Sequence, residues 1–311
     1  MVKKMKHLLS LLEYSESEFI KLLELAEKIK ADWAKGKRSE FLPRKILGLV
    51  FEKPSLRTRV SFESAMMQMG GNSIFLGTSD GKMGVRESIA DFARTISHYV
   101  DAVVLRTFSH ETVLEFAKNS SVPVINGLSD LFHPCQSMAD ILTIREKLGS
   151  KPGKNITFVG DGNNVSRSLA IACALAGYNF SLAGPKQYHF SKDFLALFSN
   201  RFPKVVLNQF SDTNECIKSA DIIYTDVWTS MGQENENDKR IKKFKDFQIN
   251  DRLMNKAPKH CKFMHCLPAH RGEEVSASVI DGPASIVFDQ AGNRMHAQKA
   301  ILHDLILGFK K

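Results

Sequence analysis

Apolar and polar positions alternate along the chain in a way that predicts strands and helices in turn. Ser15 and Glu18 have the spacing of a capping box, and apolar residues follow at the helical period up to Ile29. Short apolar runs then recur between amphipathic segments. In the first half, the predicted strands cover 46–51, 72–76, 102–105 and 122–126, and the predicted helices cover about 19–29, 56–69, 87–99, 111–118 and 136–148.

The segment Gly149–Lys154 interrupts this alternation and is the expected joint between two domains. In the second half, strands are predicted at 155–160, 179–183, 221–226, 262–266 and 285–289, helices at 166–177 and from about 294, and a loop with a short helix at 233–250. Strands that alternate with helices imply parallel sheets. We therefore expect an α/β protein of two doubly wound domains, each with a central parallel sheet flanked by helices, that face each other across a ligand-binding cleft.

Composition narrows the class of protein. The 311 residues are 43% hydrophobic and 25% charged, which is typical of a globular protein. No apolar stretch approaches the roughly 20 residues of a membrane helix. The basic start Met1–Lys6 is followed by a segment too short and too soon acidic for a signal peptide. We expect a cytoplasmic protein that does not enter a membrane.

Charge and cysteine content exclude further classes. The net charge is +9, but the lysines are spread out and the cluster Lys239–Lys243 has no interleaved aromatic residues, which favours a solvated face over a nucleic-acid site. The five cysteines are scattered, without a C-x-x-C pair. This pattern argues against a disulfide framework and against a structural zinc site, so neither a metal nor a cofactor is predicted.

The segment Glu52–Arg59 lies between a predicted strand and a predicted helix. It places two hydroxyl groups and two guanidinium groups within five residues at the start of a helix. Helix N-termini favour anions, and arginine binds phosphate oxygens in a bidentate manner. A helix capped by one hydroxyl and flanked by surface arginines is the alternative. Arg106, at the end of another predicted strand, would add a third guanidinium to a phosphate site.

Two further segments carry candidate chemistry. Gly160 and Gly162 follow a strand and open a helix, but Val165 stands where a dinucleotide site needs a third small residue. The paired amides Asn163 and Asn164 are suited to holding a small carboxylate there. His265–Arg271 follows an apolar strand and brings an imidazole, a thiol and a proline together at the strand's end, where open α/β sheets bind ligands. A buried structural cysteine is the alternative.

Taken together, these segments resemble the carbamoyltransferase superfamily, and most closely the ornithine carbamoyltransferase family. The resemblance runs nearly from end to end. The motifs that carry it are Ser55–Arg59, His133–Gln136, Asp226–Gly232, His265–Pro268 and the pair Asn293–Arg294.

The resemblance implies a carbamoyl-phosphate domain at 1–148, an ornithine domain at 149–293, and a last helix at about 294–311 that packs back on the first domain. The residues implied for carbamoyl phosphate are Ser55, Leu56, Arg57, Thr58, Arg59, Lys82, Arg106, His133, Gln136, Cys266, Leu267 and Arg294. The residues implied for ornithine are Asn164, Asp226, Ser230 and Met231. The resemblance implies direct attack of the δ-amine on the carbamoyl carbon, with Arg57, Arg106, His133, Cys266 and Arg294 as the catalytic residues.

Three positions depart from the family pattern. Leu56 stands where many relatives have Thr, Lys82 where ornithine enzymes commonly have Gln, and Gly292 where Glu is more usual. The loop that carries Lys82 reaches a neighbouring subunit's site in the family, which implies a homotrimer with sites at subunit interfaces.

Alternatives remain at this point. A carbamoyltransferase for aspartate, putrescine or an acylated ornithine would share the phosphate site. The Gly160 turn leaves open an NAD-dependent dehydrogenase, and a relative without catalytic activity would serve as a binding or scaffold protein.

Overall fold

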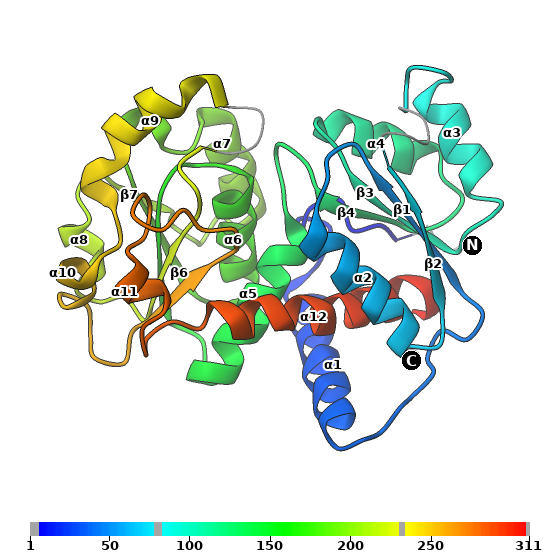
Figure 1. Cartoon of the computed structure of the whole chain (residues 1–311), viewed down its shortest axis with the longest axis horizontal. Helices are drawn as coiled ribbons and strands as arrows, with labels where there is room; N and C mark the ends of the chain where they lie inside the picture. The colour runs from blue at the N-terminus through cyan, green and yellow to red at the C-terminus, as the bar shows by residue number, and fades with distance from the viewer. Residues whose placement is uncertain (1–5, 78–82, 230–233, 309–311) are drawn as a thin grey trace. The chain divides into compact units, whose positions relative to one another are not determined.

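A computed structural model of the chain describes residues 6–77, 83–229 and 234–308. It divides into two compact units, one formed by Met1–Leu142 and Asn293–Lys311 and the other by Thr143–Gly292. Each unit has a parallel sheet flanked by helices, as Figure 1 shows, with four strands in the first and five in the second. The predicted fold class is confirmed. The boundaries between the units fall inside two helices, α5 (Pro134–Leu148) and α12 (Val287–Leu307).

The first unit is built on the strand order β2-β1-β3-β4. Its strands are β1 (Ile46–Phe51), β2 (Asn72–Leu76), β3 (Ala102–Arg106) and β4 (Val124–Leu128). The helices are α1 (Glu16–Ala34), α2 (Leu56–Gln68), α3 (Ile89–Ile96), α4 (His110–Asn119) and the beginning of α5 (Pro134–Leu148). Since β2 and β3 lie on opposite sides of β1, the order reverses at β1 and β3, where open α/β sheets bind ligands.

The second unit follows the same plan with the order β7-β6-β5-β8-β9. Its strands are β5 (Asn155–Val159), β6 (Asn179–Ala183), β7 (Asn208–Phe210), β8 (Ile222–Thr225) and β9 (Lys262–His265). The α-helices include α6 (Asn164–Ala176), α7 (Lys192–Arg201), α8 (Asn214–Ile217), α9 (Asn237–Phe244), α10 (Asp251–Met254) and α11 (Ala277–Ile280), with 3-10 turns η1 (Lys186–Tyr188), η2 (Glu234–Glu236) and η3 (Lys245–Phe247). The order reverses between β5 and β8.

The predicted strand at 285–289 is wrong, and the last helix begins earlier than predicted. Only Ser285 forms a bridge, to Phe263, and α12 runs from Val287 to Leu307. The run Ile286-Val287-Phe288 has high strand propensity, but the side chains of Ile286 and Val287 are buried while Phe288 is exposed. Tertiary packing has overridden local propensity at this point.

α12 is polar on its buried side, and this polarity ties it to the first unit. Arg294 donates to Thr58 of α2 (2.9 Å), Lys299 donates to Gln68 of α2 (2.5 Å), and Asn293 accepts from Lys30 of α1 (2.7 Å). In Figure 1, α12 (red) accordingly lies beside α1 and α2 (blue). A buried helix with this many polar groups is held in one register, because each group must keep its partner.

In the part of the chain that the structure describes, two clusters of buried apolar residues pack against the sheets. One gathers Val103, Leu105 and Phe116 with α3 and α4, and the other gathers Ile223, Phe263 and Val275 with α10 and α11. Among the residues that the structure describes, no helix combines the length and the apolar character that crossing a membrane requires.

Gly184 generates a prediction about the second sheet. It follows β6, and a Cβ atom there would overlap the carbonyl oxygen of Gly160, which follows the neighbouring β5. Because the overlapped oxygen belongs to the backbone, the overlap can be relieved only if the end of one strand moves. Gly184→Ala is therefore expected to lower the free energy of unfolding by about 1–3 kcal/mol in chemical denaturation. Gly292→Ala is the control, since its Cβ would meet nothing within 4 Å on α12 and is expected to be neutral or stabilising. Equal destabilisation by both substitutions would contradict the steric reason.

Lys299 generates a second prediction. The side chain is fully buried, with its Nζ atom 4.2 Å from the ring centre of Trp33, and burial, together with Arg38, lowers its pKa to about 8. Because the pKa of Lys299 is lower in the folded state than in the unfolded chain, protonated Lys299 lowers the free energy of unfolding at pH values below about 8. This destabilisation decreases as the pH rises and disappears towards pH 10.5. Lys299→Met removes the charge and is expected to raise the free energy of unfolding at neutral pH by at most about 3 kcal/mol. The loss of the hydrogen bond to Gln68 subtracts from this gain.

The expected result is a higher melting temperature for Lys299→Met than for the wild type at pH 7, with a difference that narrows by pH 9.5. Lys21→Met on the exposed side of α1 is the control, and it should show no such pH-dependent gain. A gain from Lys299→Met that stays constant between pH 7 and 9.5 would show that the buried charge is not its cause.

Candidate active site

The loop after β1 forms the first part of the site. Ser55 is the N-cap of α2, and its Oγ accepts from the Thr58 backbone N–H at 3.4 Å and donates to Thr58 Oγ1 at 3.1 Å. The cap therefore explains Ser55 structurally, but not the guanidinium groups around it. The free N–H groups of the first turn and the helix dipole favour an anion here.

Three arginines from distant parts of the chain meet behind this cap. Arg57 follows Ser55, Arg106 ends β3 opposite Phe51, and Arg294 comes from α12. Arg106 is buried, and burial followed by the charges of Arg294 and Arg57 lowers its pKa to about 10. An effect of the Arg294 and Arg57 charges on the Arg106 pKa requires the three groups to be close together.

His133 and Gln136 belong to the same cluster through the start of α5. His133 is buried, and burial with the charges of Arg294, Arg106 and Arg57 holds its pKa well below the usual range. The ring is therefore neutral at pH 7 and retains one N–H donor. Gln136 is buried too, and its amide nitrogen donates to Asp140 at 2.9 Å while its Oε1 has no hydrogen-bond partner in the described part of the chain.

The charge balance of this cluster favours an anionic ligand. Within residues 6–77, 83–229 and 234–308, no carboxylate forms an ion pair with Arg57 or Arg106, and Arg106 Nε has no acceptor. Buried cations without counter-charges are costly in a folded protein. A small dianion with several oxygen acceptors would offset that cost, because arginine recognises phosphate through paired N–H groups.

Two of the predicted phosphate residues lie away from the cluster. Arg59 donates to Glu63 at 3.0 Å and stacks over Phe75, and its side chain is exposed. The Leu56 side chain is 77% exposed, so only its backbone can serve an anion at the helix start. Sequence spacing alone does not separate Arg57 from Arg59, whereas helical geometry turns them to different sides.

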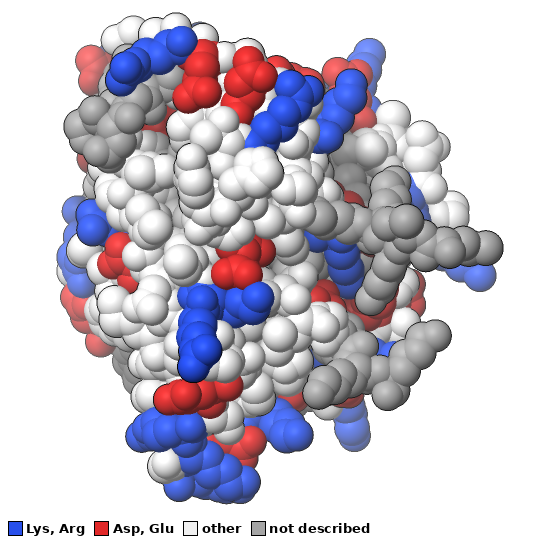
Figure 2. Space-filling model, turned by 90° about the vertical axis from the view of Figure 1, so that its right-hand side faces the viewer, with Lys and Arg blue, Asp and Glu red and all other residues white. Residues whose placement is uncertain are grey.

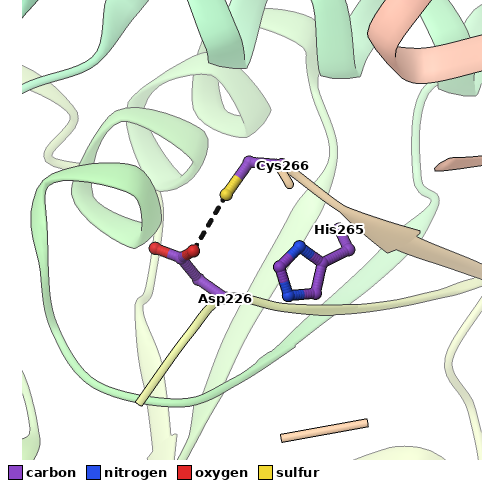
Figure 3. A group of neighbouring side chains, drawn as sticks. All are labelled: Asp226, His265 and Cys266. Atoms are coloured by element: carbon purple, nitrogen blue, oxygen red, sulfur yellow. Dashed lines mark hydrogen bonds between the residues drawn. The ribbon is translucent and has the colours of Figure 1, made fainter. Parts of the chain in front are cut away.

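The second unit gathers a different set of groups at the carboxyl ends of β5, β8 and β9. Asn163 caps α6, accepting from Val165 and Ser166 N–H at 3.0 Å each, and donates from its amide to Asp226 at 3.1 Å. Asp226 also accepts from the Cys266 thiol at 2.9 Å, the contact drawn in Figure 3. A carboxylate held between an amide and a thiol at a partly open strand end is suited to a cationic amine.

The Gly160 turn is occupied by the protein's own packing. A Cβ on Gly162 would come within 2.9 Å of Phe190, and the Gly162 N–H donates to the Tyr188 carbonyl at 2.7 Å. In a dinucleotide fold this glycine instead lets the backbone approach a pyrophosphate. The turn therefore gives no support to the dehydrogenase alternative.

Among the described residues, two groups of three side chains have metal-ligand types: Asp226, His265 and Cys266, and a second group of His270, Glu273 and Glu274. Asp226, His265 and Cys266 offer ligand atoms within 4.8 Å of one another. Both ring nitrogens of His265 already have partners, since Nδ1 accepts from the Leu267 N–H at 2.8 Å and Nε2 lies 3.1 Å from Glu274. Binding of a metal by His265 would break one of these hydrogen bonds.

Of the other predicted residues, Asn164 is the first residue of α6 and is partly exposed, and Leu267 follows Cys266 in the turn after β9. Lys82, Ser230 and Met231 lie outside the described residues.

Sequence reasoning missed the side chains that support this site. Arg240 of α9 is buried, forms an ion pair with Asp161 and donates to the Trp228 carbonyl. Gln290 accepts from the His265 backbone N–H at 3.0 Å and donates to the Tyr224 hydroxyl at 2.9 Å. Each contact joins residues far apart in the chain, so no local pattern could reveal it.

Comparison with known proteins matches both halves of the chain. The family model described as "Aspartate/ornithine carbamoyltransferase, carbamoyl-P binding domain" matches residues 6–146. The model described as "Aspartate/ornithine carbamoyltransferase, Asp/Orn binding domain" matches residues 152–305.

Individual relatives match over nearly their whole length. A protein of Archaeoglobus fulgidus named ornithine carbamoyltransferase is 47% identical over 302 residues, covering 97% of this chain and 98% of the relative. Another of that name from Anoxybacillus flavithermus is 46% identical over 305 residues, covering 97% and 96%. The solved structure of ornithine carbamoyltransferase from Pyrococcus furiosus has a TM-score of 0.94 at 45% identity and covers 98% of each chain. The chain therefore belongs to the aspartate/ornithine carbamoyltransferase family.

Proposed function

We propose that this protein transfers the carbamoyl group of carbamoyl phosphate to the δ-amine of L-ornithine, giving L-citrulline and phosphate. The observation that carries the proposal is the cluster of partly buried Arg57 with buried Arg106, Arg294 and neutral His133, which has the charge and the donors for a carbamoyl phosphate dianion. The names of the two relatives from Archaeoglobus fulgidus and Anoxybacillus flavithermus support ornithine as the acceptor. The setting that we propose is arginine biosynthesis in the cytoplasm.

The phosphate group would bind at the start of α2. Ser55 and Thr58 supply hydroxyl groups, the first turn of the helix supplies N–H groups, and Arg57 supplies a paired donor. Arg59, Leu56 and Lys82 remain part of the proposal in lesser roles, with the Leu56 backbone at the helix start. As the tetrahedral intermediate collapses, the bond between the carbamoyl carbon and the phosphate oxygen breaks. The leaving phosphate keeps its arginine partners, which stabilises the departing charge.

The carbamoyl carbonyl would be held by Arg106, His133 and Arg294, with Gln136 Oε1 accepting from the carbamoyl amide. Attack of an amine on the carbonyl carbon places negative charge on its oxygen in the tetrahedral intermediate. A neutral imidazole N–H and a buried guanidinium are preorganised donors to that oxygen, and each such donor contributes roughly 3–4 kcal/mol to the transition state.

Ornithine would bind at the second unit through the side chains at the ends of β5 and β8. Asp226 suits the α-amino group, and Asn164 at the start of α6 suits the α-carboxylate, with Ser230 and Met231 completing the pocket. The δ-amine resembles that of lysine, with an ordinary pKa of about 10.4, and must lose a proton before it attacks. We propose that Cys266 and the Leu267 backbone orient this amine and the carbamoyl group, without a covalent intermediate.

The test is citrulline formation from carbamoyl phosphate with L-ornithine, aspartate, putrescine or N-acetylornithine as the acceptor. Ornithine is expected to react alone. Arg106→Ala should lower kcat about 10²–10³-fold through loss of a donor to the developing oxyanion. Asp226→Asn should chiefly raise KM for ornithine, because the α-amino group loses its counter-charge.

Arg94→Ala is the matched control for Arg106→Ala, since Arg94 is exposed on α3 and pairs with Asp91. Full turnover by Arg106→Ala would show that the arginine cluster does not take part in the reaction. Turnover with an acceptor other than ornithine would keep the phosphate site and overturn the ornithine pocket.

We also propose a homotrimer with the active sites at subunit interfaces. Large apolar side chains are exposed along one face of α2 and on the edge strand β2. On α2, Val60 is 47% exposed and Met67 65% exposed, and on β2, Ile74 is 45% exposed. An open edge strand next to an apolar helix face favours pairing with another chain. Figure 2, which looks onto the side of the molecule where β2 lies in Figure 1, shows broad uncharged areas between the charged side chains.

The mass in solution tests this assembly. By light scattering, the wild type should have three times the 34.9 kDa of one chain, and Met67→Glu should shift it towards a single chain. Activity should fall with the mass, because Lys82 would be supplied by a neighbour. Val206→Glu, on an exposed apolar residue of the second unit, is the control and should stay trimeric. A trimer that persists in Met67→Glu would place the interface elsewhere.

A further inference from the structure

The turn after β9 holds one residue in an unfavourable backbone conformation. Leu267, between Cys266 and Pro268, has φ +56°, in the left-handed region that favours glycine. A leucine there costs roughly 1–2 kcal/mol, so neighbouring contacts must hold it. The conformation matters because Leu267 directly follows the thiol that bonds to Asp226.

The imidazole of His265 holds this residue. Its Nδ1 accepts from the Leu267 backbone N–H at 2.8 Å, while its own backbone N–H donates to Gln290 at 3.0 Å. Because Nδ1 is an acceptor, the ring proton is on Nε2. Nε2 lies 3.1 Å from Glu274 Oε1, which makes the carboxylate the acceptor that fixes the tautomer.

Glu274 joins both ends of the segment. The same Oε1 atom accepts from the His270 backbone N–H at 2.6 Å, and the Glu274 side chain is 0% exposed. Burial of a carboxylate is costly even with two donors. A residue that merely filled this position could be apolar, whereas an acceptor for the His265 ring could not.

We propose that Glu274 is a positioning residue for the carbamoyl-transfer site. Acting through His265, it holds Leu267 in its left-handed conformation and thereby keeps the Cys266 thiol against Asp226. This inference rests on the proposed function in that it takes the Cys266–Leu267 turn to contact the reacting groups.

Cys266 provides a direct readout of the turn. Cys135, Cys173, Cys216 and Cys261 are buried and Cys266 is partly exposed, so the folded protein should present one reactive thiol to Ellman's reagent. The carboxylate beside Cys266 disfavours its thiolate. Release of the turn in Glu274→Ala should therefore speed the reaction of this one thiol about 10-fold or more, with no substrate present.

The same variant should lower kcat for citrulline formation about 10–100-fold, with a smaller change in KM for ornithine, because misplacement of a reacting group acts mainly on the transition state. Glu274→Gln keeps the Oε1 acceptor and should restore both the slow thiol reaction and most of kcat. Glu273→Ala is the matched control. Glu273 lies next in sequence, is partly exposed and pairs with His270 at 3.4 Å, so neither readout should change.

The number of reacting thiols separates positioning from loss of packing. If Glu274→Ala exposes more than one thiol, Glu274→Leu, which keeps most of the volume without an acceptor, replaces it. A slow single thiol and wild-type kcat in that variant would overturn the inference. A freed thiol with unchanged citrulline formation would instead show that the Cys266 turn lies outside the site, and would overturn that part of the proposed function.

Discussion

Parallel strand pairing decides where the chemistry of this protein lies. In a parallel sheet every strand runs the same way, so the carboxyl ends of all strands share one edge. Phe51 pairs with Arg106 in one sheet, and Thr225 pairs with His265 in the other. Residues that follow these strands are therefore neighbours in space although they lie 40 to 55 positions apart. Both groups of candidate residues depend on this geometry, and so do the buried contacts that hold them.

Charge is the second constraint, and it is most evident in the first unit. In the first unit, burial together with the charges of Arg294 and Arg57 lowers the pKa of Arg106, and burial with the charges of these arginines keeps His133 neutral. The fold bears this cost because α12 is anchored by its own polar contacts, from Asn293 to Lys299, and delivers Arg294 to Thr58. Strain and repulsion of this kind are common at functional sites and are compensated elsewhere in the fold.

Much of the fold could be predicted from local pattern, because strand ends, caps and glycine breaks are written within a few residues of one another. The capping box of Ser15 and Glu18 and the strands β1, β2 and β6 fall where the periodicity places them. The start of α12 does not, since an Ile-Val-Phe run looks like a strand until its neighbours are known. The predicted elements do not include α7 and β7, although Phe194 and Phe198 have the spacing of a buried helix face.

The candidate site divides in the same way. Motifs predict candidate residues at particular strand ends, yet they do not distinguish Arg57 from Arg59, whose partners are Glu63 and Phe75. The ion pair of Asp161 with Arg240 and the hydrogen bond of His265 with Glu274 were also out of reach. Such contacts depend on which surfaces the tertiary structure brings together, and no single segment contains that information.

The two units use one local device for opposite ligands. In each, the first strand leads to an N-cap at the point where the strand order reverses: Ser55 after β1, whose Oγ accepts from Thr58, and Asn163 after β5, whose amide oxygen accepts from Ser166. The cap satisfies the helix and leaves the rest of the turn for a ligand. Around Ser55 the neighbours are guanidinium groups, which suit a phosphate. Beside Asn163 the neighbour is the Asp226 carboxylate, which suits an amine. The difference in the proposed ligands therefore comes from the side chains that surround each cap, while the N-cap geometry is shared.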